Sequence, residues 1–207
     1  MSRERATALL VDFDGVLRRW DPAVAVGVER AYGLTEGVLD EIAMSWGLLQ
    51  PVLTGQVSHA EWMASVAAAL TPSVGEQQAQ AAVDEWQRYR GEVDPQVLTF
   101  VREVRASGVP VGLATNATDV LDADLAALGL EGELDVVINS SVVGTHKPAK
   151  EYFEAACEAL RTSPSRVLLV DDNDRVVAGA RVAGLSAHRW SGPGDLRYLR
   201  AALAPAG

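Results

Sequence analysis

Short aliphatic runs alternate with helical patterns over the outer parts of the chain. Each run is apolar without a period of two, which is typical of strands buried on both faces of a sheet. The runs cover residues 8–11, 109–114, 134–138 and 167–170. Helical patterns cover residues 94–107, 118–128, 149–160 and 174–183. This alternation predicts an α/β fold with a doubly wound parallel sheet.

Three glycines lie just beyond predicted helices. Gly108, Gly129 and Gly184 each come directly after the last residue of a helical pattern. Helices often end in a left-handed residue, a conformation that glycine adopts without steric cost. We therefore expect all three to close the helices that they follow.

The alternation stops between residue 20 and about residue 90. This stretch carries helical patterns, contains no convincing pair of strands and is long enough to pack as a small bundle. We assign residues 1–18 and 92–207 to a Rossmann-like core and residues 19–91 to a helical cap inserted after the first strand.

Four of the five tryptophans fall in this inserted part of the chain. Large aromatic side chains dominate small cores, so we expect Trp46, Trp62 and Trp86 to fill the interior of the bundle. Trp20 follows the first strand closely and is a candidate for the border of a substrate site.

Composition narrows the class of protein. The 207 residues include 48% hydrophobic residues and carry a formal charge of −10, which argues against disorder, nucleic-acid binding and anionic membranes. A single cysteine, Cys157, excludes an internal disulfide, and its helix face, shared with Phe153 and Leu160, indicates core packing. Residues 42–60 are too interrupted to span a membrane, and the start lacks the features of a signal peptide. We expect a cytoplasmic protein, either a monomer or a homodimer.

Polar residues follow four of these segments. They are Asp12, Asp14 and Gly15 after the first run, Thr115 and Asn116 after the second, Lys147 before a helix, and Asp171 and Asp172 after the last run. In an open parallel sheet, ligands bind beyond the carboxyl ends of the strands. The sequence therefore predicts that these residues meet at one edge of the sheet.

The carboxylates suggest a cation and a covalent step. Asp12 and Asp14 would share one face of a regular strand, and Asp171 and Asp172 would complete a cation site. Clustered carboxylates repel and are costly to bury, but Mg²⁺ prefers such oxygen ligands. One carboxylate can act as a nucleophile while a second transfers protons to and from the reacting groups.

The remaining polar residues suit a phosphate group. Gly15 permits a sharp turn and a close approach of backbone N–H groups to an anion. Thr115 offers a hydroxyl group and Lys147 a positive charge to the transferring group.

The order of these motifs resembles that of the haloacid dehalogenase superfamily of phosphohydrolases. The matching segments are DFDGVL (12–17), LATN (113–116), HKP (146–148) and LLVDD (168–172), within a resemblance that spans residues 8 to about 190. Each motif is weak alone, but four in order after plausible strands form a strong signal. The insertion resembles a C1 cap of subfamily IA. The similarity is greatest to the branch that contains the N-terminal phosphatase domain of soluble epoxide hydrolases.

The resemblance implies a role for each phosphate-handling residue. Asp12 would be the nucleophile, and Asp14 the general acid and base. Thr115 and the Asn116 backbone would hold a phosphoryl oxygen, and Lys147 would bridge the phosphate and Asp12. The substrate would be a small phosphorylated metabolite.

The resemblance also implies a Mg²⁺ site. Asp12, the backbone carbonyl of Asp14 and Asp172 would bind the ion, with Asp171 as an outer-shell partner. The family often has other residues at the positions of Val142, Ala149 and Val176. These departures affect substrate class and fine positioning, and none removes a catalytic group.

Other functions remain open from the residues alone. Haloacid dehalogenases of this superfamily lack an aspartate at the position of Asp14, so its presence favours a phosphatase or a phosphomutase of the β-phosphoglucomutase type. A non-catalytic regulator that binds phosphate or Mg²⁺ is a further alternative. Arg18, Arg19 and Trp20 follow the nucleophile and either recognise a substrate anion or cover surface.

Overall fold

The computed structural model describes residues 5–203, so the ends of the predicted core, residues 1–4 and 204–207, lie outside the described part. A five-stranded parallel sheet in the order β5-β4-β1-β6-β7 forms its centre. The strands are β1 (Ala8–Val11), β4 (Val111–Thr115), β5 (Val136–Asn139), β6 (Val167–Asp171) and β7 (Ser186–Arg189). The predicted doubly wound parallel sheet is therefore confirmed.

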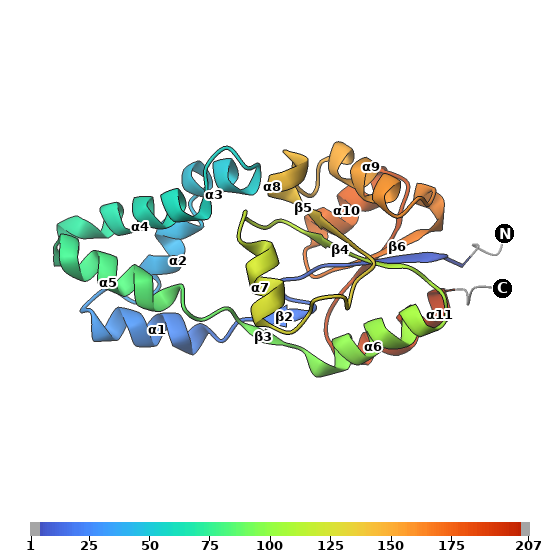
Figure 1. The fold of residues 1–207 in the computed structure, drawn as a ribbon, viewed down its shortest axis with the longest axis horizontal. Coiled ribbons are helices and arrows are strands. Elements are labelled where there is room, and N and C mark those ends of the chain that lie inside the picture. Colours follow the sequence, from blue (N-terminus) through green and yellow to red (C-terminus); the bar gives the residue numbers. More distant parts are fainter. Residues whose placement is uncertain (1–4, 204–207) are drawn as a thin grey trace.

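Helices cover both faces of this sheet (Figure 1). One face packs on α6 (Pro95–Ala106), α7 (Leu121–Ala127) and α11 (Leu196–Ala202), and the other on α9 (Lys150–Ala159) and α10 (Asp174–Val182). Along β1, Leu9 contributes to the first layer of core and Leu10 to the second. Every residue of this strand is therefore buried, which explains its uninterrupted apolar run.

The three predicted helix-closing glycines all adopt left-handed conformations. Their φ angles are +83° for Gly108, +69° for Gly129 and +96° for Gly184. Each lies just past the end of its helix, and its N–H donates to a carbonyl of the last turn. The expectation from the sequence is confirmed at these positions.

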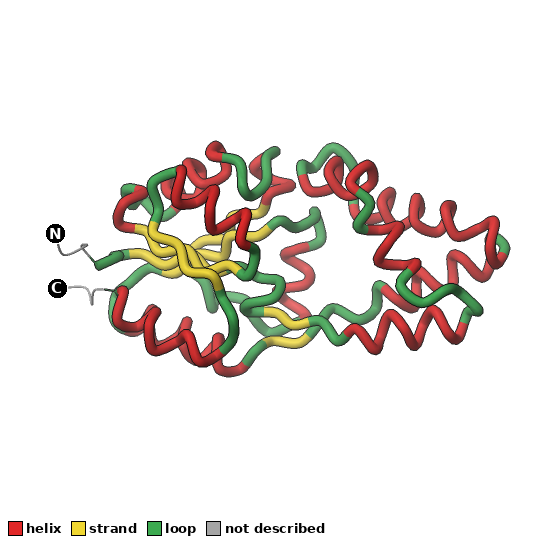
Figure 2. The backbone as a smooth tube through the Cα atoms, turned by 180° about the vertical axis from the view of Figure 1, so that it is seen from behind, coloured by secondary structure: helices red, strands yellow, loops and turns green. Residues whose placement is uncertain are grey.

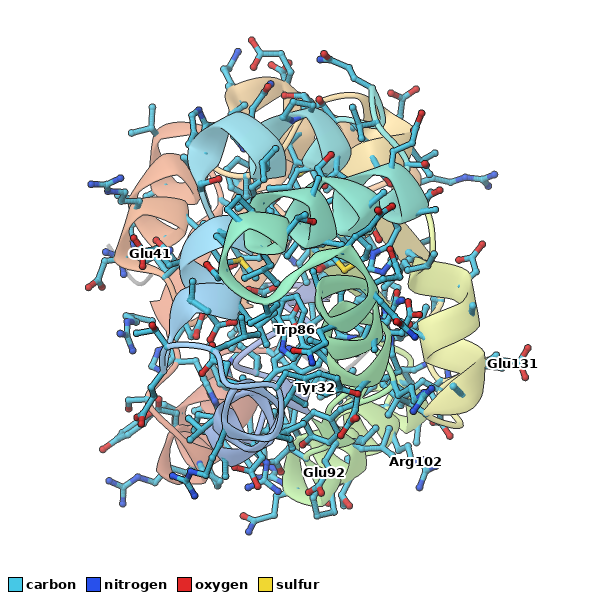
Figure 3. All side chains as sticks on the ribbon, turned by 90° about the vertical axis from the view of Figure 1, so that its left-hand side faces the viewer. Tyr32, Glu41, Trp86, Glu92, Arg102 and Glu131 are labelled. Atoms are coloured by element: carbon cyan, nitrogen blue, oxygen red, sulfur yellow. The ribbon has the colours of Figure 1, made fainter. Side chains whose placement is uncertain are left out.

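The inserted helices lie beyond the carboxyl ends of the strands (Figure 1). They are α1 (Pro22–Ala31), α2 (Val38–Ala43), α3 (Trp46–Leu53), α4 (His59–Val74) and α5 (Glu76–Trp86). They enclose an apolar core of their own, which includes Leu39, Val66 and Leu70. Figure 3 views the molecule from this end, where Tyr32 and Trp86 lie near the middle of the bundle. No helix of the described residues is long and apolar enough to cross a membrane.

The tryptophans of the insertion do not all behave as expected. Trp62 is buried and Trp86 packs partly buried against the bundle core, as predicted. The prediction for Trp46 is wrong, because 59% of its surface is exposed. Trp46 is the first residue of α3, and its ring lies against His146 of the core instead of the bundle interior.

A short ribbon that the sequence did not reveal joins the insertion to the core. β2 (Arg18–Arg19) pairs antiparallel with β3 (Glu92–Val93), so both connecting segments lie side by side between the sheet and the inserted helices (Figure 2). Two residues per strand are too few to give a recognisable pattern. The short helix α8 (Ser140–Val143) and the edge strand β7 were also missed.

A buried carboxylate organises the start of α2. Glu29 is almost fully buried, and its two oxygens accept from the N–H groups of Gly37, at 2.8 Å, and Leu39, at 2.9 Å. These donors belong to the start of α2, where the N-cap residue, Gly37, has no side chain that could cap the helix.

We expect Glu29→Ala to lower the free energy of unfolding by about 2 kcal/mol, because it leaves the N–H of the buried Leu39 without a partner and removes the acceptor of the Gly37 N–H. Glu36→Ala, which removes an exposed carboxylate nearby, serves as the control and should change it by less than about 0.5 kcal/mol. Urea unfolding followed by circular dichroism measures both. Equal stability of the two variants would contradict the assigned role of Glu29.

Candidate active site

The carboxyl ends of three adjacent strands carry the predicted site residues. Asp12 follows β1, Thr115 is the last residue of β4 and Asp171 is the last residue of β6. Because β1 lies between β4 and β6 in the sheet, these side chains start from neighbouring positions at one edge. The parallel topology therefore brings together residues that are far apart in the sequence.

Lys147 binds two of the carboxylates. Its Nζ lies 2.8 Å from Oδ1 of Asp12 and 2.6 Å from Oδ2 of Asp171, and only 3% of the residue is exposed. Burial lowers the pKa of Lys147, but the charges of Asp12 and Asp171 outweigh burial and raise it. Burial raises the pKa of Asp12 well above its usual range, against the opposing effect of Lys147.

The same edge has a donor set that suits a divalent cation. Asp12, Asp171 and Asp172 each offer one carboxylate oxygen, and these atoms lie within 4.8 Å of one another. Burial, followed by the charge of Asp171, raises the pKa of Asp172. A single ammonium group does not neutralise three carboxylates, and Mg²⁺ is a hard ion that prefers such oxygens. The residues present therefore fit this metal.

The two aspartates at the end of β6 differ in the hydrogen bonds that they accept. Oδ2 of Asp171 accepts from Lys147, and Oδ1 accepts from the N–H of Asn173 at 2.9 Å. The carboxylate of Asp172 accepts no hydrogen bond from another described residue and lies over Gly15. Asp172 therefore has the more available oxygens of the pair.

Asp14 turns away from this cluster. Its Oδ1 accepts from Nε of Arg18 at 2.7 Å and from Nε1 of Trp20 at 2.6 Å, and its Oδ2 accepts from Nη2 of Arg18 at 3.0 Å. The expectation that Asp12 and Asp14 share a strand face is wrong, because β1 ends at Val11. The group of carboxylates that suits a cation contains Asp12 and not Asp14.

Arg18 is buried, which excludes for this residue the alternative that it covers surface. Its Nη1 donates to Oδ2 of Asp124 at 3.0 Å, and its guanidinium lies 4.0 Å from the ring centre of Phe13. Arg90, at the end of the insertion, binds the two oxygens of Asp124 at 2.7 and 2.6 Å. The donors of Arg18 are thus engaged by protein carboxylates.

The next two predicted residues remain more exposed than Arg18. The side chain of Arg19 is 59% exposed, and its Nε lies 3.5 Å from Oδ2 of Asp94. Trp20 is 45% exposed and makes an edge contact with Tyr89. Trp20 therefore borders the site through Asp14, whereas Arg19 faces the start of α6.

Asn116 has a contact that the sequence did not suggest. Its Oδ1 accepts from the N–H of Lys147 at 2.8 Å, and its Nδ2 donates to the carbonyl of Lys147 at 3.0 Å. The amide therefore fixes the backbone that carries the buried ammonium group. Thr115 is buried, and its hydroxyl bonds to no other described residue, which leaves it available to a ligand.

Two further residues, Tyr152 and Asp124, hold this edge of the sheet in place, although no sequence motif indicated them. The Tyr152 hydroxyl donates to the carbonyl of Ile138 at 2.6 Å and contacts that of Thr115 at 3.3 Å. Asp124, the fourth residue of α7, binds both Arg18 and Arg90. Such roles depend on which strands and helices become neighbours, so no local motif reveals them.

The insertion also contacts the loop after Asn116. The N–H of His59 donates to Oδ1 of Asp119 at 2.8 Å, and Nδ1 of His59 lies 3.3 Å from the Thr118 hydroxyl. Burial, then the charge of Arg90, lowers the pKa of His59. His59 is thus a structural contact between the insertion and the core.

This chain is similar to known proteins in sequence and in fold. The family described as haloacid dehalogenase-like hydrolase matches residues 6–184. A phosphatase of Mycobacterium tuberculosis is 29% identical over 92% of this chain and 90% of its own.

Two solved structures have the same fold. A haloacid dehalogenase family enzyme of Bacteroides thetaiotaomicron, in complex with magnesium and inorganic phosphate, has a TM-score of 0.70 at 19% identity, covering 89% of this chain and 93% of its own. An L-2-haloacid dehalogenase from Xanthobacter autotrophicus has a TM-score of 0.67 at 25% identity, covering 97% and 85%.

The turn at Gly15 allows a test of the cation site. Its φ is +80°, and a Cβ atom there would lie 2.0 Å from Oδ2 of Asp172. We expect Gly15→Ala to displace this carboxylate and weaken Mg²⁺ binding about 10- to 100-fold, measured by isothermal titration calorimetry. Gly33→Ala is the matched control, because Gly33 has a φ of +68° with open space around it. Equal Mg²⁺ affinity in the two variants would exclude Asp172 from the site.

Proposed function

Because this chain belongs to the haloacid dehalogenase-like hydrolases, we propose that it is a Mg²⁺-dependent phosphatase of small phosphate monoesters. The observation that carries the proposal is the buried pair of Asp12 and Lys147, set among Asp171, Asp172 and the available hydroxyl of Thr115. The phosphatase of Mycobacterium tuberculosis supports phosphate esters as the substrate class.

In the first step, a carboxylate oxygen of Asp12 attacks phosphorus and the bond to the ester oxygen breaks. A proton from Asp14 goes to that oxygen, so the alcohol leaves neutral. Oδ1 of Asp12 is engaged by Lys147 and by the N–H of Phe13, whereas Oδ2 accepts from no described residue. Oδ2 is therefore the oxygen that we assign to the attack.

In the second step, water attacks the phosphorus of the aspartyl phosphate and gives its proton to Asp14. The bond between phosphorus and Asp12 breaks, which releases inorganic phosphate and restores both carboxyl groups. Lys147 and the Thr115 hydroxyl bind the phosphoryl oxygens throughout. Asn116 contributes by fixing the Lys147 backbone.

The metal would be held by Asp12 and Asp172, with Asp171 beside them and the backbone carbonyl of Asp14 completing the set. When bound, it neutralises negative charge that develops on the transferring phosphoryl group. We assign residues 19–91 to a cap over this site. Such a cap excludes water from the reacting groups and selects the alcohol.

Two alternatives share the fold. Haloacid dehalogenases displace a halide, which needs no proton, so the presence of Asp14 favours the phosphatase. A phosphomutase would use the same residues but pass the phosphoryl group to a second hydroxyl. Isomerisation of a sugar phosphate without release of inorganic phosphate would identify it.

The test is the release of nitrophenol from para-nitrophenyl phosphate, with Mg²⁺ and with EDTA. We expect EDTA to abolish turnover and Asp12→Asn to lower kcat about a thousandfold or more, because the nucleophile is lost. Asp122→Asn, which changes an exposed carboxylate on α7, should keep the wild-type rate.

Circular dichroism checks that each variant keeps its fold. Turnover by a folded Asp12→Asn variant would exclude Asp12 as the nucleophile. Phosphate release that is insensitive to EDTA would exclude the metal from the reaction.

A further inference from the structure

Two exposed tryptophans flank the proposed site. Trp20 donates from Nε1 to Asp14, and 45% of its surface is exposed. Trp46 is 59% exposed, and its ring centre lies 5.4 Å from that of His146. The Nδ1 atom of His146 lies 2.8 Å from the carbonyl of Lys147. Trp20 therefore contacts Asp14 directly, whereas Trp46 is connected through His146 to the backbone of Lys147.

Both rings are held in place while part of their surface stays open. Trp20 meets Tyr89 edge to face at 5.7 Å, and the Arg18 guanidinium lies 4.5 Å from the ring centre. Trp46 begins α3, which packs against α8 of the core. A fixed, exposed indole loses little entropy when an apolar or flat group packs on it.

The insertion is acidic overall. Residues 19–91 contain nine Asp and Glu side chains, four Arg and no Lys. Arg19 lies 3.5 Å from Asp94, and Arg90 is bound by both oxygens of Asp124. These two arginines, at the ends of the insertion, already face carboxylates of the core.

The other two arginines of the insertion lie elsewhere. Arg88 acts electrostatically on Tyr32, whose hydroxyl donates to Glu85. Arg30 is in the last turn of α1, about 12 Å along the helix from its first residue. Arg18, just before the insertion, already binds Asp14 and Asp124.

This distribution of charge decides which alcohols suit the site. Lys147 and the metal are engaged with the phosphoryl group. Arg189, which ends β7 at the same edge, already lies 3.4 Å from Oδ1 of Asp174. A second anion on the substrate would therefore face an acidic insertion without a cation of its own. An unpaired anion near like charges costs free energy that a neutral alcohol does not. The exposed indoles, in contrast, gain contact with apolar or aromatic groups.

We propose that the substrate class is phosphate monoesters with one phosphate and no other anionic group, whose alcohol packs an apolar or aromatic face on Trp20 and Trp46. This inference rests on the proposed function. Esters that carry a carboxylate or a second phosphate are poor substrates for this chain.

Matched substrate pairs test the charge rule. They are phenyl phosphate against 4-carboxyphenyl phosphate, and O-phosphoethanolamine against O-phosphoserine. We expect the carboxylate to lower kcat/KM at least about tenfold in each pair, because it is left unpaired. In the phenyl pair, the carboxylate makes the phenol a better leaving group, so the electronic effect opposes the expected result.

Variants at position 46 test the indole contact without touching the catalytic groups. Trp46→Ala should raise KM for phenyl phosphate about tenfold, while Trp46→Phe keeps most of the wild-type value. Trp46→Arg should raise kcat/KM for 4-carboxyphenyl phosphate relative to phenyl phosphate. Tyr198→Ala, which removes an exposed aromatic ring on α11, is the control and should change neither.

The outcomes separate this inference from the proposed function. Equal or better hydrolysis of the carboxylated esters by the wild type, or unchanged constants in all Trp46 variants, would overturn the substrate class while the phosphatase stands. Failure to release phosphate from any ester with Mg²⁺ would overturn both.

Discussion

The rest of the site depends on the ion pairs that the buried ammonium group of Lys147 forms with Asp12 and Asp171. Lys147 joins a carboxylate that follows β1 to one that ends β6, and its own backbone is fixed by Asn116 at the end of β4. Removing one partner of such a buried ion pair typically costs about 3–5 kcal/mol, because the other charge stays desolvated. The contacts of Lys147 therefore connect the carboxyl ends of the three neighbouring strands β4, β1 and β6.

A second network binds the insertion to the core. Arg18 and Arg90 lie at opposite ends of the inserted segment, and both donate to Asp124 of α7. Arg18 also binds both oxygens of Asp14. The carboxyl group that we assign to proton transfer is thus tied to the connection between the two parts.

The central strands of the sheet were predictable from the sequence, because a strand that is buried on both faces is an uninterrupted apolar run. Leu9 and Leu10 face different layers and are both apolar, so the run reads as a central parallel strand. The polar residues at the strand ends were also predictable, since parallel strands end at the same edge. Whether Asp12, Asp14, Thr115 and Lys147 perform the proposed roles stays a prediction.

Other features depend on contacts that no local pattern encodes. The periodicity of a strand says nothing about a residue beyond its end, so Asp14 was placed with Asp12 when it binds Arg18. Trp46 was assigned to the bundle interior from its residue type, although its partner is His146 of the core. The clamp of Asn116 on Lys147 joins residues 31 apart, which only the folded sheet brings together.

Charge sets how a phosphate ester must be recognised by this chain. With a formal charge of −10, the protein does not attract an anionic substrate from a distance. Lys147 provides positive charge at the edge of the sheet, but it is buried and shared between two carboxylates. Under the proposed function, attraction therefore acts over a short range, through the cation, the Thr115 hydroxyl and Lys147. Since long-range attraction contributes little, discrimination between phosphate esters falls to contacts with the alcohol, and Trp20 and Trp46 are the exposed rings that we assign to these contacts.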